Sequence, residues 1–375
     1  MEIWGKGTIN QLGLFIKDWK CSKVLIVTGK QSYDNSPKKI EIERILDKFT
    51  VIRYHNFEVN PNIESIIEGL ILVADFNPDV IIGIGGGSVM DTTKLLSVLP
   101  SNKELVHEII INAGSVPTRL SRLVLVPTTA GSGSEATHFA VVYKEKTKYS
   151  VASKNMLADL VILDPEFLET LPRELRAISA FDAFSQAVES YWSVGATKES
   201  QQYASKSLQI LVETFDSLIE NPTNRVWDSM MEASFLSGKA INISKTTGPH
   251  AISYAITQYF GIPHGLAVIL TLPAFLSFNS TISLENLNNK LNFKEFTGRI
   301  NKLFELLRVK DAESAKIKIN KMIILAGFNI GLRNYGINNQ ADLLMLSESV
   351  NIERLSNNPI NLDKYQIQAV LRKAW

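Results

Sequence analysis

The sequence has few of the features that mark exported, membrane-spanning or nucleic-acid-binding proteins. Cys21 is the only cysteine in 375 residues, which excludes an intramolecular disulfide and a cysteine zinc cage and fits a reducing compartment. No apolar run approaches the roughly 18 residues of a membrane-spanning helix, and the first residues lack the basic-then-apolar order of a signal peptide. With 39 Lys and Arg against 38 Asp and Glu, the net charge of +1 removes the electrostatic footprint of a nucleic-acid or anionic-membrane binder. We therefore expect a cytoplasmic protein that binds neither nucleic acid nor membrane.

The composition is that of an ordinary globular protein, with 45% hydrophobic and 21% charged residues. A chain of 375 residues exceeds the usual size of one hydrophobic core, so we expect two domains packed across a cleft. Such a cleft is a common place for a cofactor and a substrate to meet.

Short β-rich apolar runs, alternating with amphipathic stretches, fill the first half of the chain. The predicted strands are Lys23–Thr28, Val51–Tyr54, Asp79–Ile84, Leu123–Val126 and Leu160–Leu163, with a predicted helix over Ile63–Ala74. Continuous apolar strands separated by helices indicate a mostly parallel sheet covered on both faces, and thus an α/β fold.

After Asp164-Pro165 the pattern changes to long stretches with apolar residues three or four positions apart, which is typical of amphipathic helices. The predicted helices are Leu175–Trp192, Gln202–Leu218, Trp227–Leu236, Phe293–Leu307 and Ala312–Ala326. We place a boundary near Leu171-Pro172, which gives an α/β domain of residues 1–171 and an all-α domain of residues 172–375.

A glycine-rich segment from Gly83 to Asp91 lies between a predicted strand and a predicted helix. Its three consecutive glycines let the backbone approach a ligand, and the N–H groups of the next helix offer a positive pole to a pyrophosphate. A tight structural turn and a capping box of Ser88 and Asp91 are the alternatives. The glycines follow a later strand rather than the first, unlike an ordinary Rossmann fingerprint.

A second loop of small residues, Pro127 to Glu135, follows the next predicted strand. By itself it could be an ordinary loop, but hydroxyls and bare backbone at the carboxyl end of a parallel strand suit ligand binding. Two such loops after neighbouring strands favour a dinucleotide as the ligand.

The helical half contains candidates for a metal site. Asp182, Gln186 and Glu189 share one helix face because they are about one turn apart. His250 and His264 follow, and one carboxylate with two imidazoles suits Fe(II) or Zn(II). From the residues alone, two histidines at this separation are more often unrelated.

These segments, in this order, resemble the iron-dependent (group III) alcohol dehydrogenase family. The matching motifs span essentially the whole chain: Gly7, Gly85-Gly86-Gly87-Ser88-x-x-Asp91-x-x-Lys94, Pro127–Glu135, Asp164-Pro165, Asp182-Ala183, Pro263-His264-Gly265 and Asn358-Pro359. The resemblance implies a Rossmann-like dinucleotide-binding domain and a helical metal-binding domain, an architecture shared with dehydroquinate synthase. It also implies an oxidoreductase, and we expect a homodimer or larger homo-oligomer.

The resemblance assigns a set of cofactor-binding residues. Gly86, Gly87 and Ser88 would hold the pyrophosphate, with Asp91 in the same motif; Thr128, Thr129 and Ser132 would line the adenosine and nicotinamide-ribose path; and Lys148 would contact a ribose. Family members that prefer NAD carry an Asp where this chain has Gly29, followed here by Lys30 and Ser32. Without that carboxylate a 2′-phosphate escapes a like-charge repulsion on the order of 1–4 kcal/mol. We therefore expect NADP(H) to be favoured over NAD(H).

The family holds its metal on Asp-x-x-x-His and two later histidines, positions filled here by Asp182, Gln186, His250 and His264. The metal would be Fe(II) or Zn(II). An amide oxygen is a weaker ligand than imidazole, so the resemblance implies reduced affinity or a changed use of the site. Tyr254 stands where many members carry a second histidine thought to relay protons, and a buried structural tyrosine is the alternative.

Lys245, Thr246 and Thr247 precede His250, where members acting on simple alcohols have an apolar stretch that lines the substrate pocket. A cation and two hydroxyls suit an anionic head group. Together with residues 189–193 they resemble the phosphonoacetaldehyde reductase branch of the family. The expected reaction is reduction of phosphonoacetaldehyde to 2-hydroxyethylphosphonate, by hydride transfer to a metal-polarised carbonyl. A solvent-facing lysine in a helix-capping turn is the alternative.

Three other functions stay open. They are a general alcohol dehydrogenase of the butanol or propanediol type, a metal-free non-catalytic nucleotide-binding relative, and a dehydroquinate-synthase-like lyase. Retention of Asp182, His250, His264 and both small-residue loops argues against the metal-free relative. The glycine pattern and the Asp-x-x-x-Gln pattern fit the dehydrogenases better than the lyase.

Overall fold

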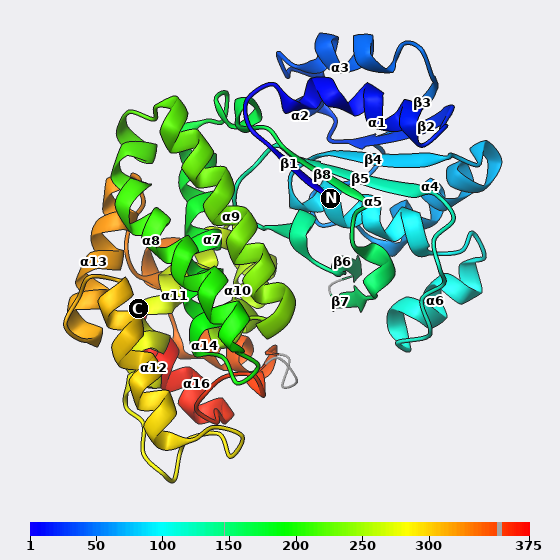
Figure 1. The fold of residues 1–375 in the computed structure, drawn as a ribbon. Helices are drawn as coiled ribbons and strands as arrows, with labels where there is room; N and C mark the ends of the chain where they lie inside the picture. The colour runs from blue at the N-terminus through cyan, green and yellow to red at the C-terminus, as the bar shows by residue number, and fades with distance from the viewer. Residues whose placement is uncertain (146, 351–354) are drawn as a thin grey trace. The chain divides into compact units, whose positions relative to one another are not determined.

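The computed structural model describes residues 1–145, 147–350 and 355–375. The backbone divides into two compact units, Met1–Leu171 and Pro172–Trp375. The first unit holds a sheet flanked by helices, and the second is built of helices (Figure 1). The predicted fold class, an α/β unit with a parallel sheet followed by a helical one, is confirmed.

The main sheet of the first unit has six parallel strands in the order β1-β8-β5-β4-β2-β3. Their bounds are β1 Glu2–Trp4, β2 Lys23–Thr28, β3 Thr50–Tyr54, β4 Val80–Gly85, β5 Arg122–Pro127 and β8 Leu160–Leu163. All five predicted strands are therefore present. Because β2, β4 and β5 are neighbours and parallel, the loops that follow them leave the same edge of the sheet.

Alternate residues of each strand face opposite layers of helices, as the two-residue period of a strand requires. Val24 and Ile26 of β2 belong to a core shared with α1 (Leu12–Asp18) and α3 (Lys39–Leu46). Leu25 and Val27 belong to the opposite core, shared with α4 (Ile63–Phe76), α5 (Gly87–Val98) and α6 (Lys103–Ile111). Figure 1 shows the two layers above and below the sheet.

The first unit also contains an antiparallel pair that the sequence pattern did not predict. It consists of β6 (Phe139–Lys144) and β7 (Thr147–Ala152). Ala140, Val142 and Val151 from this pair lie in the same core as α5. The pair therefore covers α5, the helix that follows the glycine-rich loop.

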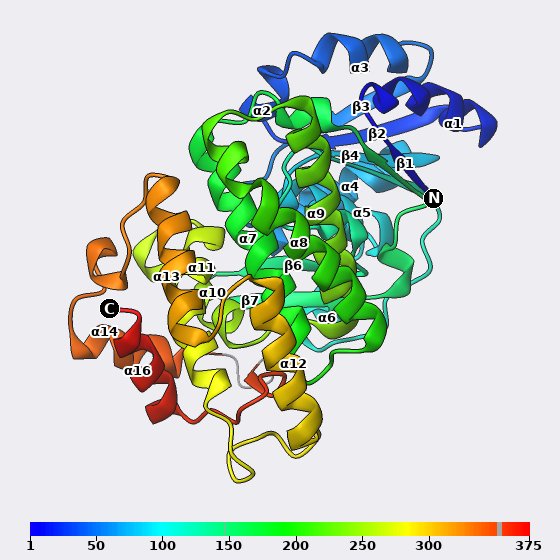
Figure 2. The same cartoon turned by 60° about the vertical axis from the view of Figure 1, so that its left-hand side comes forward.

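The second unit is organised around one long buried helix. The helices within its described residues are α7 Arg173–Trp192, α8 Lys198–Glu220, α9 Asn224–Ser244, α10 Gly248–Phe260, α11 His264–Ser280, α12 Phe293–Leu306, α13 Ala312–Leu325, α14 Gln340–Glu348 and α16 Lys364–Lys373. Every residue of α7 from Ala180 to Trp192 is buried. Helices α8, α9, α11 and α12 pack around it (Figure 2). Polar side chains on this helix therefore lie inside the unit.

Helix α11 was not predicted, because residues Gly265 to Leu276 are buried on every side and give no amphipathic period. Within the described residues, none of the helices has the length and apolar character needed to cross a membrane.

Candidate functional site

The glycine-rich loop joins β4 to the first turn of α5. Helix α5 begins at Gly87 and no side chain caps its first N–H groups. The Ser88 hydroxyl instead accepts a hydrogen bond from the Asn60 N–H at 3.1 Å. The capping box that the sequence left open is therefore not formed, and the helix N-terminus keeps its positive pole for an anion.

The two loops of small residues, which follow neighbouring strands, lie against each other. Thr128 N donates to Gly85 O at 2.9 Å. A Cβ on Gly86 would lie 3.2 Å from Thr129 Oγ1, and one on Gly87 would lie 3.1 Å from Ser132 Oγ. A Cβ at either position would therefore crowd this close approach, which brings the predicted pyrophosphate and ribose residues together.

The carboxylate of Asp91, a predicted cofactor-binding residue, is engaged by the protein itself. It accepts hydrogen bonds from Ser134 Oγ at 2.6 Å and from Val141 N at 3.0 Å. One turn later, the fully buried Lys94 ammonium donates to Ser134 O at 2.7 Å and to Phe139 O at 2.6 Å. Both residues therefore fix the second loop on α5.

Burial shifts the pKa values of the two ionisable groups beneath the second loop in the direction that favours their uncharged forms. Burial lowers the pKa of Lys94 to about 8, although the charges of Asp91 and Glu135 oppose the shift. Burial likewise raises the pKa of Glu135 to about 7, opposed by a backbone hydrogen bond and by the charge of Lys94. The loop thus carries a carboxyl that titrates near neutral pH.

The segment after β2 contains the residues expected to select the nucleotide. A Cβ on Gly29 would lie 2.2 Å from Ser32 Oγ, so these two residues are in contact. Lys30 and Ser32 are exposed, and Lys30 Nζ lies 4.0 Å from a carboxylate oxygen of Glu58. The three predicted residues therefore form one exposed turn at the carboxyl end of β2.

Arg53, at the end of β3, holds this turn and was missed by the sequence analysis. Its guanidinium donates to Thr28 Oγ1 at 2.7 Å, to Gly29 O at 2.9 Å and to Asp34 Oδ1 at 2.7 Å. Hydrogen bonds from Arg53 and Lys39 lower the pKa of Asp34 to about 2. An arginine near the end of the strand that follows Gly29 in a dinucleotide-binding fold was the available signal.

Asp182, His250 and His264 come together in the helical unit. Asp182 lies on α7, whereas the histidines lie in the first turns of α10 and α11. Asp182 Oδ1 is 3.2 Å from His250 Nε2 and 3.9 Å from His264 Nε2, and the three ligand atoms all lie within 4.8 Å of one another. Tetrahedral ligands about 2.0–2.1 Å from Zn²⁺ are about 3.3–3.4 Å apart. The predicted donors therefore fit a divalent cation after a small contraction.

Glu189, one turn beyond Gln186 on α7, orients His250. Its buried carboxylate contacts His250 Nδ1, and its other oxygen accepts from Thr247 N at 2.9 Å and from His250 N at 3.3 Å. It therefore caps α10 and directs His250 Nε2 towards Asp182. Carboxylates commonly hold metal-binding histidines in this way. The spacing from Asp182 was the signal in the sequence, but no metal-related role was assigned.

The second imidazole is oriented by a hydroxyl. The Ser253 hydroxyl donates to His250 O at 2.8 Å and lies 3.3 Å from His264 Nδ1. When the Ser253 hydrogen goes to His250 O, His264 Nδ1 donates to the hydroxyl, and His264 Nε2 is then the electron-pair donor. Tyr254 stacks on the same imidazole, with ring centroids 5.3 Å apart and an interplanar angle of 7°.

The electrostatics of the cluster favour positive charge. Burial alone would lower the pKa of His250, but the charge of Glu189 and hydrogen bonds to Asp182 and Glu189 raise it to about 10. Burial alone would raise the pKa of Asp182, whereas His250, His264 and Gln186 together lower it. A divalent cation would replace the proton on His250, because an imidazole must be deprotonated to bind a metal.

The Lys245 turn follows α9 and precedes His250. Lys245 has φ 59° and ψ 178°, a conformation that residues other than glycine rarely adopt. Asn357 Nδ2 holds the turn on both sides, donating to Ser244 O at 2.8 Å and to Thr246 O at 2.9 Å. Lys245 is exposed, and no hydrogen bond or ion pair within the described residues engages its ammonium.

Thr247, a predicted substrate-binding residue, has its hydroxyl engaged inside the helical unit. It is fully buried, and its hydroxyl donates to Glu189 Oε1 at 2.9 Å while accepting from Trp192 Nε1 at 2.9 Å. Both hydrogen-bonding functions of the hydroxyl are therefore committed. Thr246 is half-buried next to Lys245, and Lys148 is half-buried in β7, opposite Tyr143 of β6.

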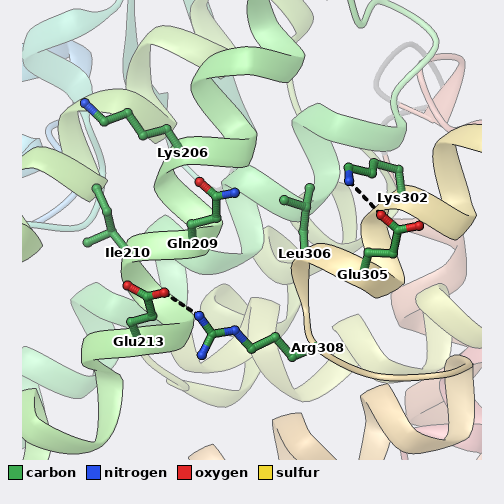
Figure 3. A pocket seen from close by; sticks show the side chains of 8 residues that line it. All are labelled: Lys206, Gln209, Ile210, Glu213, Lys302, Glu305, Leu306 and Arg308. Atoms are coloured by element: carbon green, nitrogen blue, oxygen red, sulfur yellow. Dashed lines mark hydrogen bonds and ion pairs between the residues drawn. The ribbon is translucent and has the colours of Figure 1, made fainter.

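A surface hollow lined by α8 and α12 holds none of the predicted site residues (Figure 3). Figure 3 shows Glu213 directed at Arg308 and Lys302 directed at Glu305, and both are ion pairs. Lys206, the remaining cation, pairs with a carboxylate of α9 at 2.5 Å. Because each cation has a carboxylate partner, the hollow offers no ready anion site.

Family models match both units of the chain. The model described as iron-containing alcohol dehydrogenase matches residues 2–165. The model described as Fe-containing alcohol dehydrogenase family, C-terminal, matches residues 176–375.

Individual relatives extend this match. Sulfoacetaldehyde reductase of Bilophila wadsworthia is 30% identical over 98% of this chain and 96% of its own length. Phosphonoacetaldehyde reductase of Streptomyces viridochromogenes is 29% identical over 78% of this chain and 75% of its own. The crystal structure of sulfoacetaldehyde reductase from Bifidobacterium kashiwanohense in complex with NAD⁺ has a TM-score of 0.89 at 23% identity, covering 100% of this chain and 96% of that one. That structure supports the fold alone.

Proposed function

The chain belongs to the iron-containing alcohol dehydrogenase family, and on that premise we propose that it reduces a small aldehyde with an anionic head group. Phosphonoacetaldehyde is the proposed substrate, 2-hydroxyethylphosphonate the product and NADPH the reductant. The family makes the chain an alcohol dehydrogenase or aldehyde reductase. The substrate, the nucleotide preference and the roles of individual residues are the proposal.

Lys245 is the residue whose surroundings support the proposal of an anionic head group on the substrate. An exposed ammonium, with no ion pair to any residue that the structure describes, stands on a strained turn five residues before His250. Asn357 holds that turn on both sides. Backbone strain of this kind persists only where surrounding contacts enforce it, and it is common at ligand sites. Charged hydrogen bonds from lysine suit phosphonate or sulfonate oxygens. The two relatives reported above are named for aldehydes that bear such acid groups, sulfoacetaldehyde and phosphonoacetaldehyde.

The carbonyl end of the substrate is proposed to lie at Asp182, His250 and His264, with Gln186 as a fourth donor. When bound, a divalent Fe or Zn ion supplies Lewis-acid polarisation of the carbonyl oxygen, and the reduced nicotinamide supplies the hydride. Glu189 and Ser253 keep both imidazole Nε2 atoms directed at Asp182. These contacts fix the geometry of the donors before substrate arrives.

Tyr254 is proposed to pass a proton to the product oxygen. Its half-buried ring stacks on His264, so the phenol is held against a donor of the metal cluster. A phenol can donate its proton through water to a developing alkoxide. The uncapped first turn of α5 and the Thr128, Thr129 and Ser132 loop are proposed to hold the dinucleotide.

Sulfoacetaldehyde is a second candidate substrate, because the sulfoacetaldehyde reductase match covers 98% of this chain. A sulfonate offers three oxygens and one negative charge, so the Lys245 argument applies to it as well. The two head groups therefore have to be compared directly.

The test is steady-state reduction of phosphonoacetaldehyde, sulfoacetaldehyde and butyraldehyde, followed by the absorbance of the reduced nicotinamide, after metal analysis of the purified protein. The proposal expects phosphonoacetaldehyde to have the highest kcat/KM with NADPH. A higher value for sulfoacetaldehyde would replace the substrate with the second candidate. Equal values for butyraldehyde would leave a general short-chain alcohol dehydrogenase.

A further inference from the structure

Gln186 is enclosed between two polar partners inside the helical unit. It is 4% exposed on the α7 face that carries Asp182. Its Oε1 lies 3.0 Å from the Ser237 hydroxyl of α9, and its amide forms a hydrogen bond with the Asp182 carboxyl. Since water does not reach the side chain, each end of the amide depends on the protein for a partner.

The hydrogen bonds around Gln186 and Ser237 can be arranged in two ways. Ser237 Oγ lies 3.0 Å from Gln186 Oε1 and 2.8 Å from Ser234 O, but its single hydrogen can serve only one of them. In the first arrangement Ser237 donates to the amide oxygen and the amide nitrogen donates to Asp182. In the second the amide is turned over, its nitrogen donates to Ser237 Oγ, and Ser237 donates to Ser234 O.

The two arrangements differ in what they present to Asp182. The first satisfies the carboxylate with an N–H donor. The second directs the amide oxygen at the carboxylate, and two acceptors with no hydrogen between them repel each other. A divalent cation between Asp182, His250 and His264 removes that repulsion, because it takes oxygen and imidazole ligands together.

We propose that Gln186 becomes a metal ligand by turning its amide over, and that Ser237 is the positioning residue that permits both orientations. A serine hydroxyl can donate to the amide oxygen before the cation binds and accept from the amide nitrogen afterwards. This inference rests on the proposed metal site and is independent of the proposed substrate.

Ser234 provides a matched control on the same helix. It is 1% exposed, and its hydroxyl has no hydrogen-bond partner among the described residues. Ser234→Ala therefore removes a buried hydroxyl of α9 without changing the partners of Gln186. Ser237→Ala removes the hydroxyl that contacts the amide.

The experiment is a Zn²⁺ competition titration of the metal-stripped full-length protein against a chromophoric chelator, with Co²⁺ absorption as a report on the ligand set. Loss of a group that orients a metal ligand costs about 10- to 100-fold in affinity. Ser237→Ala is expected to weaken Zn²⁺ binding by that factor and to change the Co²⁺ spectrum, whereas Ser234→Ala leaves both as in the wild type. In a Gln186→Ala background, Ser237→Ala is expected to have no further effect.

Equal Zn²⁺ affinities for the wild type and Ser237→Ala would overturn the inference, as would a loss that persists in the Gln186→Ala background. A wild-type protein that binds neither ion would overturn it as well. Because no aldehyde is present, a failure of the phosphonoacetaldehyde proposal leaves these outcomes unchanged.

Discussion

The Glu189 carboxylate contacts the Nδ1 atom of His250 across a separation of 61 residues, and the same carboxylate caps the helix that carries the histidine. One buried acid thus sets both the helix start and the direction of the imidazole. His250 Nε2 is left 3.2 Å from Asp182 Oδ1. The metal cluster therefore depends on a residue that is not one of its predicted ligands.

We expect Glu189→Gln to weaken Zn²⁺ binding by about 10- to 100-fold. The amide keeps an oxygen for Thr247 N and His250 N, but its NH₂ group can donate to His250 Nδ1 and so move the imidazole proton to Nε2. Chelator competition on the stripped protein measures the change. A variant that melts like the wild type yet binds Zn²⁺ equally well would show that Glu189 serves only the helix cap.

The nucleotide preference is expected to depend on Gly29. NADPH should give a higher kcat/KM than NADH, and Gly29→Asp should reverse the ratio, because the new carboxylate repels a 2′-phosphate. A side chain at this position meets Ser32 Oγ, with 2.2 Å between the added Cβ and that atom. Gly29→Asp should therefore also be made with Ser32→Ala, and Ser32→Ala alone is the control. A wild-type preference for NADH, or an unchanged ratio in both aspartate variants, would contradict the assignment.

The sequence predicted the strands and the two loops because their signals are local. Strand β2 was predicted with its observed bounds, Lys23–Thr28, since a continuous apolar run between polar residues and glycine has few alternatives. The β6 and β7 pair was missed because no glycine or proline separates the two strands in the sequence.

The roles of individual site residues were less accessible, because they depend on partners far away in the chain. Asp91 looks like part of the cofactor motif, but its bonds to Ser134 and Val141 appear only in the fold. Glu189 shares its helix face with Asp182, yet its function depends on His250. The spacing of residues on one helix therefore predicted where the site lies, but it did not predict the role of each residue.

Glu135 is expected to make stability depend on pH below neutrality. Burial raises its pKa from 4.5 to about 7, so the folded protein keeps the proton that the unfolded chain loses. The contribution is fully present below pH 4.5, falls as pH rises and is lost above about pH 7. Glu135→Gln should remove this slope and exceed the wild type in stability at pH 8 by at most about 3 kcal/mol. Urea unfolding at several pH values tests this, and parallel curves for the two proteins would contradict it.

Lys245 carries the substrate proposal, and its backbone supplies a matched pair of variants. A charged hydrogen bond to a phosphonate contributes about 1.5–3 kcal/mol, so Lys245→Ala and Lys245→Gly should each lose about 10- to 150-fold in kcat/KM for phosphonoacetaldehyde. Neither should change kcat/KM for butyraldehyde much, because the ammonium is proposed to bind only the head group.

The two variants should differ in stability. With φ 59° and ψ 178°, position 245 suits glycine, so Lys245→Gly relieves strain that Lys245→Ala retains. The Lys245→Gly variant should therefore unfold at a higher urea concentration than the Lys245→Ala variant. The difference in the free energy of unfolding should be on the order of 1 kcal/mol or more. If kcat/KM fell equally for both aldehydes, and fell further in the less stable variant, Lys245 would be a structural residue. Loss on phosphonoacetaldehyde alone, shared by the stabilised and the unstabilised variant, would assign the effect to the missing lysine side chain and not to backbone strain.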